Sequence, residues 1–470
     1  MRTNRRMKGM ALTAMVLAAN VGAVVSQTGA VLAEETVTMT SQAAVLPTDN
    51  TGYVPMEEVM EMEQSPIDVI VEGNNQFGTE LVMMLAKEGK NVFISPYSIT
   101  SALSLLNHCS ETGEQVEELR SFLGYDSLSE EELLAAQADL LEQLRPDYGL
   151  DGLTVEEKQE LGIGSVEIAN AVFVDDDLAL IPTDLTKNTL SDVLAAYQAE
   201  IASKELSSEE TKDEINAWVK EKTHEMIDSL LNEPLSEDTA MLLMNTVYFM
   251  GNWTNSFPEE ATDEQTFHGA NGDTQVSMMH QQDRFGYAET ESYQQIMLPY
   301  NSGYVMNVYL PKDGVSVEDV SSELYQNALN GQEISYQSKE MILSMPKFEM
   351  EYSAQLKDVL MEMGLEKIFD YAVYDRVSEA EMGVSQILHK TALKNDEHGT
   401  EAAAVTAIMV ETMALMEPET PIEVTIDRPF YFTITHRGTG VNLFEGCIFD
   451  LEPEQSGETV SSTEAPTGLR

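Results

Sequence analysis

Three short motifs in this chain match part of a catalytic pattern, and each lacks a residue that its chemistry needs. No glycine follows Gly164-Ser165-Val166, so the tight elbow that exposes a nucleophilic serine is missing. The zinc-protease helix motif fails because Asp228 stands where His224-Glu225 would need a second histidine. Gly438 and Gly440 lack the third glycine of a dinucleotide site. The sequence therefore predicts no enzyme, no metal site and no cofactor.

The charge balance excludes a further class of function. The 470 residues include 81 acidic and 26 basic side chains, which gives a formal net charge of −55. Because nucleic-acid binders need a basic face and anionic lipid repels an acidic one, we expect neither a nucleic-acid partner nor stable membrane association. Hydrophobic residues make up 43% of the chain, enough for a large buried core. Only Cys109 and Cys447 are present, so the fold has one disulfide or none.

The first 33 residues have the layout of a secretory signal peptide. An uncharged run at residues 9–33, apolar over residues 10–25, follows four basic side chains and ends in Val31-Leu32-Ala33. The alternative is a membrane anchor, but an apolar run of 16 residues is short for a span. We therefore predict cleavage after Ala33 and a secreted, extracellular protein.

The rest of the chain divides into two polar ends and one long central part. Residues 34–66 are rich in Thr, Ser, Glu and Pro without a sustained period, which predicts a flexible spacer. Residues 452–470 have the same character, which predicts a disordered tail. No Pro-, Gly- or Ser-rich break interrupts residues 67–451, so we expect them to form a single domain.

Helical and strand patterns alternate irregularly along this central part. Helices are predicted at residues 77–86, 96–106 and 208–231, the last from apolar residues at three-and-four spacing. Strands are predicted at residues 168–174, 242–249, 296–298, 304–310, 341–345, 387–393, 424–426, 430–435 and 441–449. The mixture indicates an α+β fold with large, mostly antiparallel sheets.

The segment between residues 395 and 427 differs from the rest of the chain. Residues 402–410 carry no charge, although charged residues make up 23% of the sequence, so this run is suited to burial. Helix propensity favours an amphipathic helix here. In an extended conformation, residues from Thr400 to Val410 would have small side chains on both faces, so the run could form a strand instead. Pro418 and Pro421 then predict an extended, exposed stretch.

A resemblance to a known family favours the strand. Glu397-His398-Gly399-Thr400-Glu401, followed by small residues, resembles the hinge of the reactive-centre loop in inhibitory serpins. That hinge runs glutamate, any residue, glycine, threonine, glutamate and then small residues. Further segments resemble serpin motifs in the same order: Asn91 to Ser98, Asn245 to Trp253, His389-Lys390, Asp427-Arg428-Pro429-Phe430 and Leu443-Phe444-Glu445-Gly446. The similarity covers residues 67–451, and the ordered set is specific.

The resemblance implies both a fold and a function. The fold has three β-sheets, eight to nine helices and an exposed reactive-centre loop. The function is that of a secreted, monomeric suicide inhibitor, which forms a covalent complex with a target serine protease when its cut loop enters the main sheet as a new strand. The leader suits a Gram-positive bacterium. The alternative is a non-inhibitory serpin that acts as a carrier or folding aid, and the alanine hinge argues against it.

Two sets of residues take roles from this resemblance. The hinge consists of Glu397, Gly399, Thr400, Glu401, Ala402, Ala403 and Ala404. Val405 is larger than the alanine or glycine common at its position, which predicts slower insertion. The sheet-opening region comprises Ser95, Ser98, Asn245 and His389 below the sheet, with Lys347 and Trp253 near Glu397 at its top. A simpler interpretation makes these residues satisfied core polar groups, and both roles can hold together.

The position of the reactive bond also follows from the resemblance. Counting seventeen positions from Glu397 places Met413 before the bond and Ala414 after it, with Thr412 or Val410 as alternatives in another register. The segment between residues 395 and 427 has no Lys or Arg, so we expect targets with an apolar specificity pocket, namely elastase-like or chymotrypsin-like proteases. The stretch after Ala414 is longer than in the family pattern, so the register stays open. The acidic surface argues against activation by heparin.

Overall fold

The computed structural model describes residues 64–148, 162–178, 190–332, 334–370, 372–378, 380–400 and 420–453. Residues 1–63, 401–419 and 454–470 lie outside this description. They carry the predicted signal peptide, most of the predicted spacer, the loop with its reactive bond, and most of the predicted tail. The described residues form eight α-helices and sheets of nine, six and two strands, so the expected α+β class is confirmed.

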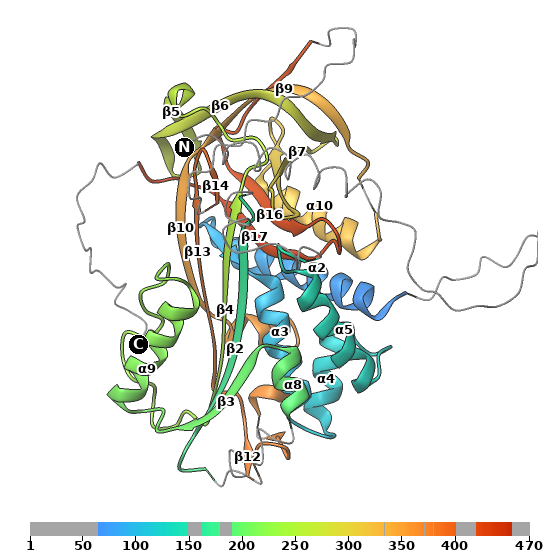
Figure 1. The fold of residues 1–470 in the computed structure, drawn as a ribbon, viewed down its shortest axis with the longest axis vertical. Coiled ribbons are helices and arrows are strands. Elements are labelled where there is room, and N and C mark those ends of the chain that lie inside the picture. The colour runs from blue at the N-terminus through green and yellow to red at the C-terminus, as the bar shows by residue number, and fades with distance from the viewer. Residues whose placement is uncertain are drawn as a thin grey trace, which may run out of the picture. The chain divides into compact units, whose positions relative to one another are not determined.

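The helices fall mainly in the first half of the described chain and in two later segments (Figure 1). They are α2 (Pro66–Leu85), α3 (Pro96–Asn107), α4 (Glu114–Phe122), α5 (Glu130–Gln143), α8 (Ser191–Ala196), α9 (Glu209–Lys222), α10 (Val317–Leu329) and α11 (Lys357–Glu362). Three short 3₁₀ helices accompany them: η1 (Ala86–Glu88), η2 (Glu259–Ala261) and η3 (Lys367–Phe369).

The largest sheet has nine strands in the order β1-β17-β16-β8-β7-β6-β9-β15, with β5 beside β6. Their bounds are β1 (Val92–Ile94), β5 (Asp263–Gly269), β6 (Gly272–Glu289), β7 (Tyr293–Pro299), β8 (Tyr304–Pro311), β9 (Gln337–Pro346), β15 (Ile422–Thr425), β16 (Phe430–His436) and β17 (Asn442–Ile448). Every ladder in it is antiparallel except that between β9 and β15.

The second sheet has six strands in the order β10-β13-β14-β4-β2-β3. Their bounds are β2 (Ser165–Asp175), β3 (Ala199–Lys204), β4 (Met241–Asn252), β10 (Phe348–Gln355), β13 (Gln386–Asn395) and β14 (Gly399–Thr400). Within it β2 pairs with β3, and β4 with β13, in parallel, whereas the other ladders are antiparallel. A small third sheet joins β11 (Ala372–Val373) and β12 (Glu381–Met382).

Two of the three predicted helices differ from the structure at one end. The first begins at Pro66 because Ser65 and Asp68 form a reciprocal cap ahead of it. The helix predicted at residues 208–231 ends at Lys222. His224 and Glu225 adopt φ values of 50° and 68°, which a right-handed helix cannot include, although apolar residues continue at helical spacing beyond them.

The nine predicted strands all fall on strands of the structure, but sequence periodicity missed others. The largest omission is β6, which spans 18 residues. Its sequence contains three Gln, two Asp and two Gly, and only some of its residues are buried. The omitted β10 alternates between more buried and exposed positions. Its exposed positions carry acidic or polar residues, which lie between the apolar ones. Polar strands of this kind are stabilised by pairing with neighbours and not by their own hydrophobicity.

The six-stranded sheet has α9 on one side and α3 and α5 on the other (Figure 1), and an apolar cluster lies on each side. On one face α9 packs through Ile215 and Val219 against Leu242 and Met244 of β4. The opposite face of β4, including Leu243, belongs to the main core together with α2, α3 and α5. Alternate residues of one strand therefore contact two different layers, as the two-residue period of a strand requires.

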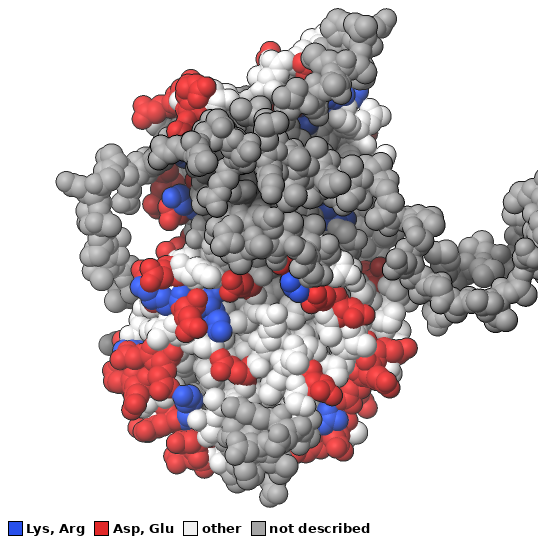
Figure 2. All heavy atoms as spheres, viewed as in Figure 1, with Lys and Arg blue, Asp and Glu red and all other residues white. Residues whose placement is uncertain are grey.

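The surface carries the charge excess that the composition predicts (Figure 2). Acidic side chains far outnumber basic ones on the face shown. Cys109 and Cys447 are both buried and form no disulfide, which resolves the open question of their pairing. Burial raises the pKa of the Cys109 thiol to about 12. Among the described helices, none is long and apolar enough to cross a membrane.

One carboxyl group is fully buried within the main core. Glu445 on β17 accepts hydrogen bonds from Asn442 at 2.8 Å, from Thr79 at 3.3 Å and from the hydroxyl of Tyr431. Burial raises its pKa to about 7, although these hydrogen bonds favour the ionised form. The protonated form is therefore favoured in the folded state at mildly acidic pH.

We predict that Glu445 makes the folded state less stable as pH rises. The unfolded carboxyl ionises near pH 4.3 or so, whereas the folded one stays protonated until about 7, so stability is lost across this window. The free energy of unfolding of the wild type should fall relative to that of Glu445→Gln when both are measured by urea denaturation at increasing pH. The exposed Glu423→Gln is the control, and an equal pH trend in all three proteins would contradict the prediction.

Candidate functional site

The six-stranded sheet is split between its two central strands. At one end β13 and β4 pair directly, from Gln386 opposite Leu242 to His389 opposite Asn245. Beyond these four pairs, residues 390–394 and residues 246–250 have no ladder partner across the split. At the other end β14 lies between the two strands. The sheet is therefore closed at one end and already holds part of an extra strand at the other.

The strand β14 bridges the split in a defined register. Thr400 is opposite Asn395 of β13 and opposite Gly251 of β4, and both pairings are antiparallel. The two residues beside Thr400, Asn395 and Gly251, thus differ by 144 in residue number. The paired residues at the closed end, His389 and Asn245, differ by the same amount, so the two strands keep one register along the split. A strand that continued from β14 would meet both edges without a register shift.

The seat of β14 is tightly fitted. Thr400 is fully buried, and its hydroxyl lies 2.8 Å from the hydroxyl of Tyr300. Tyr300 in turn stacks on Trp253, with ring centroids 4.3 Å apart. A Cβ atom at Gly399 would lie 2.1 Å from the carbonyl oxygen of Gly251, so only glycine fits there.

The turn before β14 is held by the segment that follows β4. The main-chain N–H of Trp253 donates to the carbonyl of His398 at 2.8 Å, and its indole N–H donates to the carbonyl of Asp396 at 3.0 Å. The main-chain N–H of Phe257 donates to the carbonyl of Glu397 at 2.8 Å. Three successive carbonyls of the turn are thus fixed from one side.

Glu397 connects this turn to a second strand end. Its carboxylate lies 3.2 Å from the ammonium group of Lys347 and accepts a hydrogen bond of 2.8 Å from Thr262. Burial opposes ionisation of Glu397, but its own backbone N–H, Thr262 and Lys347 outweigh that effect and lower its pKa. The carboxylate is therefore charged at neutral pH.

The closed end of the split lies over a buried polar cluster. The main-chain N–H of Ser95 donates to Nε2 of His389 at 3.1 Å, and the Ser95 hydroxyl donates to the carbonyl of Leu443 at 2.6 Å. The Ser95 hydroxyl also caps α3 by accepting from the N–H of Ser98. Asn245 donates to the side-chain oxygen of Asn170 on β2. Burial lowers the pKa of His389 to about 3, so the ring is neutral.

Two atoms of this cluster have unused hydrogen-bonding capacity. The side-chain oxygen of Asn245 and the hydroxyl of Ser98 are buried and have no partner among the described residues. An unpaired buried polar group costs about 1–3 kcal/mol. Their position at the closed end of the split means that a polar group arriving there would be stabilised.

The family comparison agrees with this geometry. Residues 72–451 match the protein-family model described as "Serpin (serine protease inhibitor)". The chain is a serpin. Serpins are generally inhibitors of proteases and not enzymes, and they bind their target proteases. The serpin fold expected from the sequence is thus confirmed.

Individual relatives and solved structures match most of the length of this serpin. Iripin-5 of the tick Ixodes ricinus is 32% identical over 389 residues, which cover 80% of this chain and 94% of the relative. The solved structure of Tengpin, a thermophilic serpin in its native state, has a TM-score of 0.67 and 26% identity, covering 81% of this chain and 94% of Tengpin. A thyroxine-binding globulin in complex with thyroxine has a TM-score of 0.67 and 26% identity, covering 81% of this chain and 99% of the globulin.

The structure brings the described site residues of this serpin into two groups. Trp253, Lys347, Glu397, Gly399 and Thr400 lie together at the open end of the split. At its closed end lie Ser95, Ser98, Asn245 and His389. The remaining hinge and reactive-bond residues lie outside the described residues: Glu401, Ala402, Ala403, Ala404, Val410, Thr412, Met413 and Ala414.

Sequence reasoning missed several residues that hold the open end of the serpin sheet. These are Phe257, Glu259, Thr262 and Tyr300, each of which contacts the turn or β14. They lie about 100 or more residues away in sequence, and no local motif marks them. Asn170, which pairs with Asn245, lies in the middle of a correctly predicted strand, where a polar residue in an apolar run is the signal that could have marked it.

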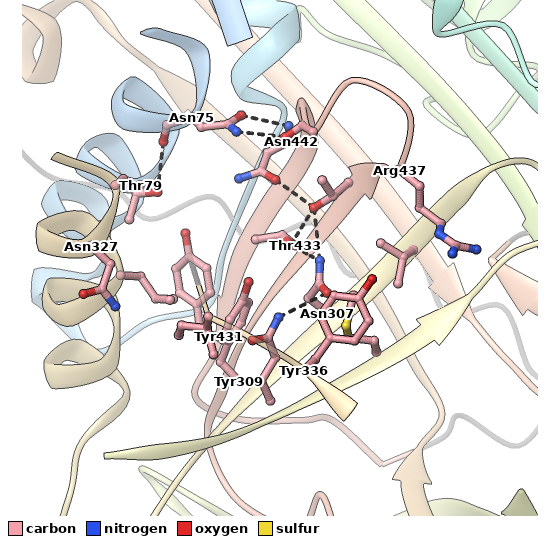
Figure 3. Close-up of a pocket in the computed structure, with 18 of the residues that line it drawn as sticks. Asn75, Thr79, Asn307, Tyr309, Asn327, Tyr336, Tyr431, Thr433, Arg437 and Asn442 are labelled. Carbon is pink, nitrogen blue, oxygen red and sulfur yellow. Dashed lines mark hydrogen bonds between the residues drawn. The ribbon is translucent and has the colours of Figure 1, made fainter. Parts of the chain in front are cut away.

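A separate cavity of about 520 Å³ lies between α2, α10 and the strands β7, β8 and β16 (Figure 3). Its walls combine apolar and polar side chains, and the polar ones pair with one another: Asn307 donates to Thr433 at 3.0 Å, and Asn75 accepts from the main-chain N–H of Asn442 at 2.9 Å. The aromatic rings of Tyr309 and Tyr431 form part of its lining. This serpin therefore has a second place that could hold a small molecule, apart from the split sheet.

We predict that His389 makes the serpin fold sensitive to acid. The folded ring stays neutral down to about pH 3, whereas the unfolded one takes up a proton below its pKa of about 6.5. The contribution of His389 to the free energy of unfolding is therefore fully present above about pH 6.5 and is lost as pH falls below it. Relative to His389→Gln, the wild type should lose up to about 1.4 kcal/mol of unfolding free energy per pH unit in this window.

Chemical denaturation between pH 7 and 4 or so measures this difference. His268→Gln is an informative control, because the hydrogen bond from His268 to Asp273 raises the pKa of that histidine. The contribution of His268 to the free energy of unfolding is therefore present at low pH and lost as pH rises. The difference in unfolding free energy between the wild type and each variant should thus change with pH in opposite directions for His389→Gln and His268→Gln. A His389 variant with the pH profile of the wild type would contradict the prediction.

Proposed function

We propose that this serpin is a suicide inhibitor of serine proteases with an apolar specificity pocket. The observation that carries the proposal is the split between β4 and β13, whose edges are in the same register at both ends. A loop that follows Thr400 can extend β14 into this split without a shift. In the proposed mechanism cleavage frees the loop, and its insertion carries the attached protease away from the site of attack.

The side chains of the loop suit this path. An antiparallel strand that continues from Thr400 places Ala402 opposite Phe249 and Leu393, and Ala404 opposite Val247 and Thr391. These four partners are all buried, so small residues fit beside them. The faces alternate, and the even-numbered loop residues enter the core side with no charged group among positions 402–408.

The same register brings a hydroxyl to the unpaired polar atoms. Thr406 falls opposite both Asn245 and His389 at the closed end. Its hydroxyl can donate to the side-chain oxygen of Asn245, which has no partner among the described residues. Insertion therefore satisfies a buried acceptor as well as adding a strand.

Strand insertion can supply the driving force that a trap needs. Each ladder hydrogen bond contributes about 1 kcal/mol net, so about ten inserted residues supply roughly 10 kcal/mol before apolar burial is counted. The native state would then be held kinetically, with its more stable partner state reached only after cleavage.

The covalent step fixes the expected target class. The serine oxygen of the protease adds to the Met413 carbonyl carbon, the bond to the Ala414 nitrogen breaks and that nitrogen takes up a proton. An ester joins the two proteins until water hydrolyses it or insertion traps it. The apolar side chain of Met413, before the cleaved bond, suits elastase-like or chymotrypsin-like proteases.

We also propose that the protein is a secreted monomer, from which residues 1–33 are removed.

We predict that Thr400→Arg converts the inhibitor into a substrate. Thr400 is fully buried beside Tyr300, so an arginine there would either bury an unpaired charge, at a cost of several kcal/mol, or leave β14 outside the sheet. Incubation with an elastase should give an SDS-resistant covalent band for the wild type. For the variant the band should fall more than about tenfold and a nicked chain should replace it.

Thr400→Val is the matched control, because it keeps the shape of the side chain and removes only the hydroxyl contact with Tyr300. It should still form the covalent band. A second measurement compares melting temperatures, since a cleaved inhibitory serpin that has inserted its loop melts higher than the intact chain. A full covalent yield from Thr400→Arg, or no increase in melting temperature on cleavage, would contradict the insertion mechanism.

A second candidate function is that of a non-inhibitory carrier or folding aid. The observation in its favour is the cavity between α2 and α10, whose walls offer both aromatic rings and hydrogen-bonding groups. Thyroxine, the ligand of the similar globulin, is a suitable probe. Calorimetric binding that Ala328→Trp on α10 abolishes, together with only a nicked chain after elastase treatment, would favour the carrier. Absence of binding with a covalent elastase band would favour the inhibitor.

A further inference from the structure

A smaller cavity of about 290 Å³ lies between α2, α4 and α10. Gln76, Phe77 and Glu80 line it, whereas Asn75 and Thr79 line the larger cavity, so the two cavities lie against different faces of α2. Ligand pockets commonly measure about 300–1,000 Å³, so this one suits only a small ligand. No residue of the split sheet lines it within the described part of the chain.

Three aromatic rings from three different helices line this cavity. Phe77 belongs to α2, Phe122 is the last residue of α4, and Tyr325 belongs to α10. The centroids of the two phenyl rings are 5.9 Å apart and their planes are inclined at 70°, so the rings form two walls that meet at a corner. Because the faces of aromatic rings carry partial negative charge, a cavity with several such walls favours a cation.

A carboxylate is fixed beside these rings. Glu80 is the only charged side chain among the described residues that line the cavity. The hydroxyl of Tyr325 donates to its carboxylate, and burial, the charge of Glu80 and this hydrogen bond raise the pKa of Tyr325. No lysine or arginine of the described lining accompanies Glu80, so the cavity holds an acidic group without a basic partner of its own.

The end of α4 adds a further preference for positive charge. The helix ends at Phe122, and the carbonyls at the C-terminal end of a helix carry partial negative charge. Arg120, in its last turn, donates to the carbonyl of Tyr125 and does not line the cavity. A Cβ atom at Gly73 would lie 2.1 Å from the carbonyl oxygen of Leu123, so only glycine lets α2 and the end of α4 come this close.

We propose that this cavity binds the trimethylammonium group of a choline-type cation. The three rings contact its methyl groups, and the carboxylate of Glu80 balances its charge. An anion does not fit, because Glu80 repels it. A hard metal ion does not fit either, because it needs several oxygen ligands and the described lining offers one carboxylate. A lysine-type primary ammonium is more strongly hydrated and loses more on entering an aromatic cavity.

The test titrates choline chloride into the full-length protein and measures binding by calorimetry, with sodium chloride at equal concentration as the reference. We expect saturable binding with a dissociation constant in the millimolar range or tighter. Dimethylbutanol, the uncharged analogue in which carbon replaces the ammonium nitrogen, should bind at least about fivefold more weakly. Absence of saturable choline binding, or equal binding of the uncharged analogue, would overturn the proposal.

Two pairs of variants locate the bound cation. Glu80→Gln should weaken choline binding at least about fivefold, whereas Glu117→Gln, which removes the same charge from an exposed residue of α4 outside the lining, should not. Tyr325→Leu should weaken it similarly, whereas Tyr325→Phe keeps the ring and should bind as the wild type does. Undiminished binding in Glu80→Gln and Tyr325→Leu, or equal losses in the two glutamate variants, would overturn the site.

Free choline and choline lipids share the trimethylammonium group, and a competition experiment distinguishes the two sources. Choline binding that phosphatidylcholine vesicles suppress would identify the lipid headgroup as the ligand. Binding that the vesicles leave unchanged would identify the free cation, and either result supports the site. These measurements need no protease, so they are independent of the proposed inhibitory function.

Discussion

The pairing of Thr400 with two strands at once is the constraint on which this structure depends. Strands in a ladder lie about 4.8 Å apart, so a strand placed between two others separates them by about twice that distance. β4 and β13 must therefore diverge from the closed end, where His389 faces Asn245, towards the end that holds β14. Between these ends each strand presents an edge without ladder hydrogen bonds across the split, which is the arrangement that an additional strand would complete.

The two ends of the split are stabilised in different ways. At the open end, Lys347 and Thr262 hold the side chain of Glu397, and two main-chain N–H groups and the Trp253 indole hold the three carbonyls of residues 396–398. At the closed end, neutral buried groups do so, with His389 bound to the backbone of Ser95. The side chain of Lys347 is 26% exposed and that of Glu397 only 9%, so this ion pair is partly shielded from water, whereas the network around Ser95 and His389 is buried and neutral. Water therefore reaches the end where β14 begins more readily than the end where β4 and β13 still pair.

Much of this serpin could be predicted from its sequence, for reasons that differ from residue to residue. The α+β class follows from alternating apolar patterns, and Thr400, His389 and Trp253 follow from family motifs. The end of α9 does not, because the left-handed conformations of His224 and Glu225 are set by tertiary contacts and not by helix propensity. The contacts of residues 253–262 with the turn before β14 do not follow from any local motif either, because two of them come from backbone N–H groups, which every residue carries, and three from side chains far in sequence from their partners. The pairing state of Cys109 and Cys447 likewise needed three-dimensional positions.

The layer that covers the sheet limits how easily a strand can enter. If the loop inserted in the register that β14 sets, its odd-numbered residues would face the α9 side, and Val405 would come opposite Thr246 and Lys390. Lys390 is tied to that side through a 2.9 Å hydrogen bond to the carbonyl of Ser229, in the segment after α9. α9 also packs across β4, with Leu388 and Ala392 of β13 at the edge of the same cluster. On insertion the larger side chain of Val405 would therefore contact the α9 layer and not the main core. Any delay that it causes should arise from displacing α9 and its following segment, and the core face keeps its small residues.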